Sequence, residues 1–117
     1  MSNNNVEIFN DAIVCLNFKG KIIQPLDITE ELSQIDFYIN SGFKYFILNL
    51  EKVSYINSFG INAFIKILTS VRSKGGELIV VSMAENVEKV FAITKLNSIF
   101  KICADIESAK HFFYNKL

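Results

Sequence analysis

Ser58 is the side chain whose type and position in the sequence best suggest a chemical role. It lies in the segment YINSFGIN, Tyr55–Asn62, where strand-forming residues give way to a helical pattern. One interpretation is purely structural: Asn57 or Ser58 caps the helix, and Gly60 allows a tight turn. However, no charged side chain occurs at positions 53–65, although charged residues make up 21% of the chain. A neutral segment suits docking of another protein, and phosphorylation would add about −1.5 to −2 charge units.

The other reactive residues do not combine into a site of known type. His111 is the single histidine and falls in a predicted helix, where a partly exposed structural role is expected. Cys15 and Cys103 each stand alone in an apolar run, which predicts buried, reduced thiols. Glu30–Glu31 suit the first turn of a helix, and Gly75–Gly76 follows a helix, as a stop signal does. The sequence therefore predicts no catalytic, metal or cofactor site.

Composition predicts one compact domain that does not bind nucleic acid and does not insert into a membrane. The chain has 117 residues, half of them hydrophobic, with 11 Phe, 1 Pro and 5 Gly, which excludes low complexity and disorder. Twelve basic residues balance twelve acidic ones without a basic cluster, so the electrostatic attraction needed for nucleic acid is missing. The amino-terminal segment does not resemble a signal peptide, and no apolar run reaches the roughly 18 residues that span a bilayer. A cytoplasmic protein is expected.

Periodicity predicts strands and helices in the order ββαβαβαβα. Strands are expected at 6–9, 12–18, 44–50, 77–82 and 99–103, and helical patterns follow Asp27, Ile61, Val87 and Asp105. The first two strands should form a hairpin through Asn10–Asp11, and Gly20–Leu26 is expected to be a loop. Asp27 and Glu30 have the spacing of a capping box, and Ser41–Gly42 should end that helix.

Such alternation is typical of an α/β fold with a mixed, mostly parallel sheet, here with an amino-terminal β-hairpin and about four helices. No linker or repeat divides the chain, so residues 1–117 are expected to form a single domain with its core at about 6–113. In these sheets the loops that leave the carboxyl ends of the strands form the functional edge. The segment around Ser58 is expected to lie on that edge.

The stretch from Tyr45 to Phe100 carries a family resemblance. A strand leads to Asn57-Ser58-Phe59-Gly60, then to a helix, Gly75–Gly76, an apolar strand and Thr94-Lys95-Leu96. This order is similar to that of the STAS domain of bacterial anti-sigma factor antagonists, in which a D-S-S-G or D-S-T-G motif occupies the same place. The resemblance spans about residues 6–113. The chain departs from the motif in having Asn57 for Asp, Phe59 for Ser or Thr, and Asn49 for an Asp in the preceding strand.

The resemblance implies a regulatory protein-binding domain without enzymatic activity. In the family, the serine at the position of Ser58 is phosphorylated by a partner that is both anti-sigma factor and serine kinase, and a PP2C-type phosphatase reverses the reaction. Asn57, Ser58, Phe59, Gly60 and Ile61 are then the expected partner-binding residues. One alternative is a STAS subunit that is never phosphorylated and works in a larger signalling or lipid-transport assembly. A further alternative is an enzyme or small-ligand carrier whose pocket leaves little trace in the sequence.

Overall fold

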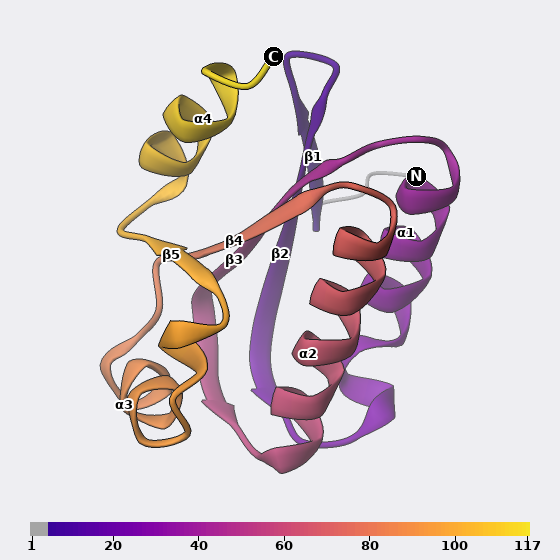
Figure 1. Cartoon of the computed structure of the whole chain (residues 1–117). Coiled ribbons are helices and arrows are strands. Elements are labelled where there is room, and N and C mark those ends of the chain that lie inside the picture. Colours follow the sequence, from indigo (N-terminus) through magenta and orange to yellow (C-terminus); the bar gives the residue numbers. More distant parts are fainter. Residues whose placement is uncertain (1–4) are drawn as a thin grey trace.

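A single mixed sheet organises the molecule (Figure 1). The computed structural model describes residues 5–117, and its five strands lie in the order β1-β2-β3-β4-β5. Strand β1 (Val6–Phe9) is antiparallel to β2 (Ile13–Ile22), whereas β2, β3 (Tyr45–Ile56), β4 (Glu77–Val81) and β5 (Lys101–Cys103) are parallel. The predicted α/β class, the amino-terminal hairpin and the mostly parallel sheet are confirmed.

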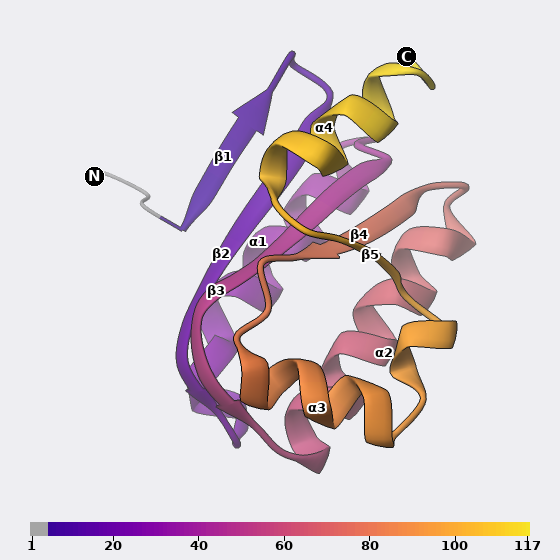
Figure 2. The same cartoon turned by 90° about the vertical axis from the view of Figure 1, so that its left-hand side faces the viewer.

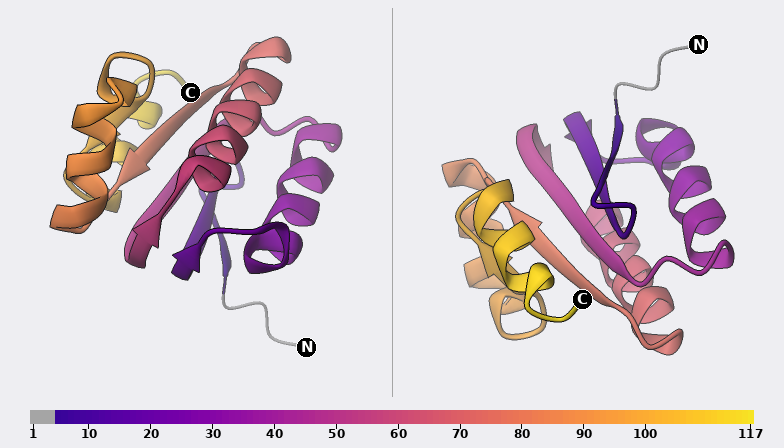
Figure 3. Two further views of the ribbon diagram at one scale, coloured as in Figure 1. Left: turned by 90° about the horizontal axis from the view of Figure 1, so that it is seen from below. Right: turned by 90° about the horizontal axis from the view of Figure 1, so that it is seen from above.

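In the described part of the chain, four α-helices connect and cover the strands. They are α1 (Thr29–Asn40), α2 (Ser58–Ser73), α3 (Glu85–Ile93) and α4 (Ile106–Tyr114). Helices α1 and α2 pack on one face of the sheet and α4 packs on the other (Figures 1 and 3). Helix α3 lies at the opposite end of the molecule from α4 (Figure 2), where it packs against the carboxyl-terminal part of β3.

Two cores result from the alternation of side chains along the strands. On β3, Phe46 and Leu48 face the larger core beneath α1 and α2, whereas Ile47 faces the smaller core beneath α4. All three are fully buried, because a parallel strand in the middle of a sheet is covered on both faces. Within the described chain, 5–117, no helix is both long enough and apolar enough to cross a membrane.

The predicted hairpin and helix stops are present for the expected reasons. Asn10 and Asp11 both have φ of 54°, the left-handed conformation that tight hairpin turns need and that Asn and Asp tolerate. Helix α1 ends at Asn40, its C-cap is Ser41, and Gly42 follows with φ of 98°. The Asp105 carboxylate accepts the Ser108 N–H at 2.8 Å and caps α4.

The expected loop at Gly20–Leu26 is wrong over its first half. Strand β2 continues to Ile22, which pairs with Ile56, because β3 is twelve residues long and offers a partner to this extension. The pairing register shifts between Gly20 and Lys21, where Gly20 has φ of 72°. A 3-10 turn, Pro25–Ile28, then leads into α1.

The predicted capping box of Asp27 and Glu30 is also wrong. Asp27 lies inside the 3-10 turn, and its carboxylate accepts the backbone N–H groups of Ile23 at 2.9 Å and Gln24 at 3.1 Å. Helix α1 begins two residues later, at Thr29, without a side-chain cap. The carboxylate therefore stabilises the turn before the helix, because the extended β2 leaves free amides within its reach.

Candidate functional site

The candidate site is the junction between β3 and α2. Strand β3 ends at Ile56 and α2 begins at Ser58, so Asn57 alone connects them. The segment expected to be a loop is therefore the end of a strand followed directly by a helix. The ends of β2 and β3 and the start of α2 lie together at the lower end of the molecule in Figure 1. This is the carboxyl edge of the sheet, as predicted.

The side-chain amide of Asn57 forms hydrogen bonds on both sides of the junction, one through its oxygen and one through its nitrogen. Its Oδ1 accepts the Gly60 N–H at 3.2 Å and caps α2, while its Nδ2 donates to the carbonyl of Ile23 at 3.2 Å. Its backbone N–H also donates to the carbonyl of Ile22 at 3.4 Å. An asparagine can do all this because its amide is both an acceptor and a donor, whereas an ionised aspartate can only accept.

Gly60 is required by a close approach of the helix to the sheet. A Cβ atom at this position would lie 2.5 Å from Cγ1 of Ile56, 2.8 Å from the carbonyl oxygen of Ile22 and 3.0 Å from Cγ2 of Ile22. Gly60 is also buried, and as a glycine it offers no side chain to a partner. Because it lacks a Cβ, the first turn of α2 can pack directly against the end of β2.

Ser58 is exposed and is the first residue of the sixteen-residue helix α2. None of the side-chain hydrogen bonds recorded among residues 5–117 involves its hydroxyl. Over residues 5–117, no histidine or carboxylate forms a hydrogen bond with this hydroxyl, which is the contact that activates a catalytic serine. It is instead an accessible acceptor at a helix N-terminus, where backbone N–H groups favour negative charge.

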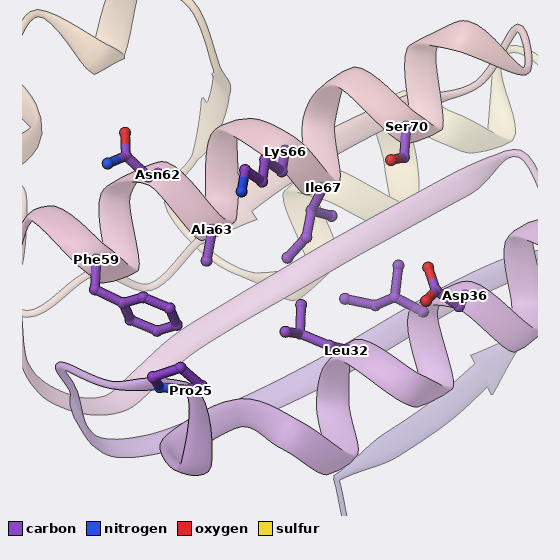
Figure 4. Close-up of a pocket in the computed structure, with 10 residues that line it drawn as sticks. Pro25, Leu32, Asp36, Phe59, Asn62, Ala63, Lys66, Ile67 and Ser70 are labelled. Carbon is purple, nitrogen blue, oxygen red and sulfur yellow. The ribbon is translucent and has the colours of Figure 1, made fainter.

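Phe59 and Ile61 are half-buried and pack against the larger core. The ring of Phe59 points toward Pro25 across a hollow between α1 and α2 (Figure 4), of about 270 Å³. Leu32 and Ile67 form part of its apolar wall. This volume is just below the range typical of small-molecule sites, roughly 300–1,000 Å³. The five predicted partner-binding residues are thus brought together, with Ser58 the most accessible of them.

Exposed apolar residues that no sequence pattern singled out surround this edge. Ile23, Leu26 and Tyr55 are exposed. Tyr55 belongs to the charge-free segment, whereas Ile23 and Leu26 fall within the predicted loop at Gly20–Leu26. The signal that could have found them is two large apolar side chains on either side of Pro25, in a connection where polar residues are more usual.

The remaining reactive groups lie away from the junction. Burial raises the pKa of the Cys15 thiol to about 12, and the nearby Glu7 carboxylate acts in the same direction. Cys103 is free but only half-buried, which corrects the expectation that both thiols are buried. His111 is exposed on α4. Over residues 5–117, the His, Cys, Asp and Glu side chains form no group of three or more that could bind a metal ion.

Comparisons with known proteins agree with this geometry. The family model described as the STAS domain matches residues 8–109. A Thermotoga maritima protein named "Putative anti-sigma factor antagonist" is 38% identical over 103 residues, which cover 88% of this chain and 90% of that protein. A crystal structure under the same description from Thermotoga maritima has a TM-score of 0.75 at 29% identity, covering 91% of this chain and 90% of the other.

The anti-sigma factor antagonist SpoIIAA has the same fold. Its unphosphorylated form has a TM-score of 0.72 at 16% identity, covering 96% of this chain and 97% of that chain. The phosphorylated form, described as a Bacillus cell fate determinant, has a TM-score of 0.71 at 18% identity, covering 92% and 96%. At these identities the likeness concerns the fold alone.

Proposed function

Because this chain belongs to the STAS domain family, we propose that it is a non-enzymatic regulatory domain that acts as an anti-sigma factor antagonist. In this proposal its partner is an anti-sigma factor that is also a serine kinase, and Asn57–Ile61 is the docking edge. Ser58 is the phosphoacceptor, and a PP2C-type phosphatase removes the phosphate. The protein works in the cytoplasm, as one domain and without a cofactor or nucleic acid.

The observation that supports this proposal most strongly is the environment of Ser58. Its side chain is exposed at the start of α2, where a kinase can reach the hydroxyl without unfolding the domain. The amino-terminal turn of a helix also accommodates a phosphate, because its free N–H groups and the helix dipole favour an anion. The occurrence of SpoIIAA in unphosphorylated and phosphorylated forms supports the view that this fold tolerates such a modification.

Charge explains how the modification would switch binding. Positions 53–65 carry no charged side chain, so no lysine or arginine of this segment would neutralise the phosphate. A partner packed against the edge would have to desolvate about −1.5 to −2 charge units. Each loss of 1.4 kcal/mol lowers affinity tenfold, so a cost of a few kcal/mol is enough to separate the two proteins.

The phosphorylation step can be tested by intact mass. The protein is incubated with ATP and the anti-sigma serine kinase of the same organism, and the expected result is one added phosphate on the wild type and none on Ser58→Ala. Ser73→Ala is a suitable control, because Ser73 is also exposed but lies at the other end of α2. Phosphorylation that persists in Ser58→Ala would refute the assignment of the acceptor.

The binding step is tested separately with Ser58→Asp. We expect this variant to bind the kinase at least tenfold more weakly than the wild type, because it places a fixed negative charge on the neutral edge. Its thermal stability should be nearly unchanged, since an acidic residue in the first turn suits the helix dipole. Equal affinity of Ser58→Asp and wild type would count against the Asn57–Ile61 edge as the interface.

A second candidate function is a STAS subunit that assembles with partners and is not modified. The observation that favours it is the double hydrogen bonding of Asn57, which joins Gly60 to Ile23 and serves the structure of the junction. The same two experiments separate the candidates. If Ser58→Asp weakens binding but the kinase adds no phosphate to the wild type, the results would favour the unmodified assembly subunit.

A further inference from the structure

Leu26 is one of the two most exposed large apolar residues among those the structure describes. Its exposed fraction is 81%, and that of Ile93 on α3 is also 81%. Single exposed apolar residues are common and need no explanation. Leu26 differs from Ile93 in its neighbourhood, because Ile23, exposed at 39%, belongs to the same connection and Tyr55, exposed at 48%, is the last residue but one of β3.

The segment Ile23–Ile28, here named the Leu26 turn, is held in a defined conformation. The Asp27 carboxylate accepts the N–H groups of Ile23 and Gln24, and the Asp27 N–H donates to the carbonyl of Gln24 at 3.0 Å. The hydroxyl of Thr29 donates to the carbonyl of Pro25 at 3.0 Å. Because the backbone of the turn is fixed in this way, binding need only order the side chain of Leu26, and such preorganisation favours affinity.

The Leu26 turn is continuous with the edge that carries Ser58. The side chain of Asn57 donates to the carbonyl of Ile23 at 3.2 Å, which fixes the turn beside the start of α2. Pro25 of the turn and Phe59 of α2 face each other across the same hollow (Figure 4). The two segments, more than thirty positions apart in the sequence, therefore form one surface.

We propose that the Leu26 turn is a second docking segment for the same kinase partner, with Leu26 as its apolar anchor and Ile23 beside it. This inference rests on the proposed function. The adjoining segment 53–65 is uncharged, whereas Glu30 and Glu31 line a hollow on the α1 side of Leu26. The surface therefore matches an apolar pocket on the partner with basic residues at its rim. A buried apolar anchor surrounded by weaker contacts is the usual composition of a binding hot spot.

The experiment compares Leu26→Ala with Ile93→Ala. Both replace an aliphatic side chain of the same exposed fraction, so neither should change stability, which is checked by thermal unfolding. Affinity for the purified anti-sigma serine kinase of the same organism is measured by calorimetry with a non-hydrolysable ATP analogue, which prevents phosphoryl transfer. Leu26→Ala is expected to bind roughly tenfold more weakly or worse, and Ile93→Ala to bind as the wild type does.

Two outcomes would overturn the inference while leaving the proposed function intact. In the first, the wild type binds and Leu26→Ala binds equally well. In the second, both variants weaken binding to the same extent, which would mean that any exposed apolar side chain contributes. A wild-type protein that binds no such kinase would instead refute the proposed function, and the Leu26 turn as a kinase-docking segment with it.

Discussion

Gly60→Ala is expected to destabilise the fold, although helix propensity alone predicts the opposite. Within a helix, alanine is more favourable than glycine by roughly 0.5–1 kcal/mol. The added Cβ, however, would lie 2.5 Å from Cγ1 of Ile56 and 2.8 Å from the carbonyl oxygen of Ile22. The side chain of Ile56 can move, but the carbonyl of Ile22 belongs to the last residue of β2 and accepts the N–H of Asn57.

The net effect follows from these two terms. Overpacking a core typically costs about 1–3 kcal/mol, and the gain in helix propensity offsets roughly a quarter to a half of the middle of that range. We therefore expect Gly60→Ala to lower the free energy of unfolding by about 1–2 kcal/mol. For a chain of this length each kcal/mol corresponds to roughly 3–5 °C in Tm.

The assay is urea and thermal unfolding followed by circular dichroism, with Asn62→Ala as the matched control. Asn62 is exposed on the same helix two positions later, so its replacement should raise the free energy of unfolding by about 0.5 kcal/mol through propensity alone. Opposite signs for the two variants would identify the close approach as the cause. A Gly60→Ala protein at least as stable as the wild type would refute the argument, because it would show that α2 can move away from β2 without cost.

Two further predictions concern caps. Asn57→Ala should lower the free energy of unfolding by about 1–2 kcal/mol, since it removes the hydrogen bonds to Gly60 and Ile23. The stability of Asn57→Asp should lie between those of the wild type and Asn57→Ala. An unchanged urea midpoint in Asn57→Ala would contradict this reasoning. At Asp105, the hydrogen bond from the Ser108 backbone N–H lowers the pKa of the carboxyl below 3.8, so its stabilising effect is present above that value and is lost as pH falls through the lowered pKa. The difference in stability between wild type and Asp105→Ala should therefore shrink on acidification from about pH 7 to about pH 3, and a difference independent of pH would argue against the cap.

The sequence alone determined the order of elements, the class of the fold and the position of Ser58 at a strand-to-helix junction. These features depend on local patterns. The alternation along β3, the helical spacing of Phe64 and Leu68 on α2 and the stop at Gly75–Gly76 each depend on residues close together in the chain. The charge-free segment at 53–65 is likewise a property of the chain itself, and the resemblance to STAS domains added the expected role of the serine.

Only the tertiary structure decided which distant residues support and surround that serine. Strands β2 and β3 extend through Lys19 and Lys52 because each supplies backbone hydrogen-bond partners to the other. The polar side chains of these residues do not predict a strand, so the pairing could not be predicted from the sequence pattern. Gly60 is required because Ile22, nearly forty positions earlier, lies against it. Leu26 lies on the same edge of the molecule as Ser58 because β2 extends to Ile22 and the Leu26 turn follows it directly. Contacts of this kind depend on where two separate segments meet in space, and the pattern within either segment does not contain that information.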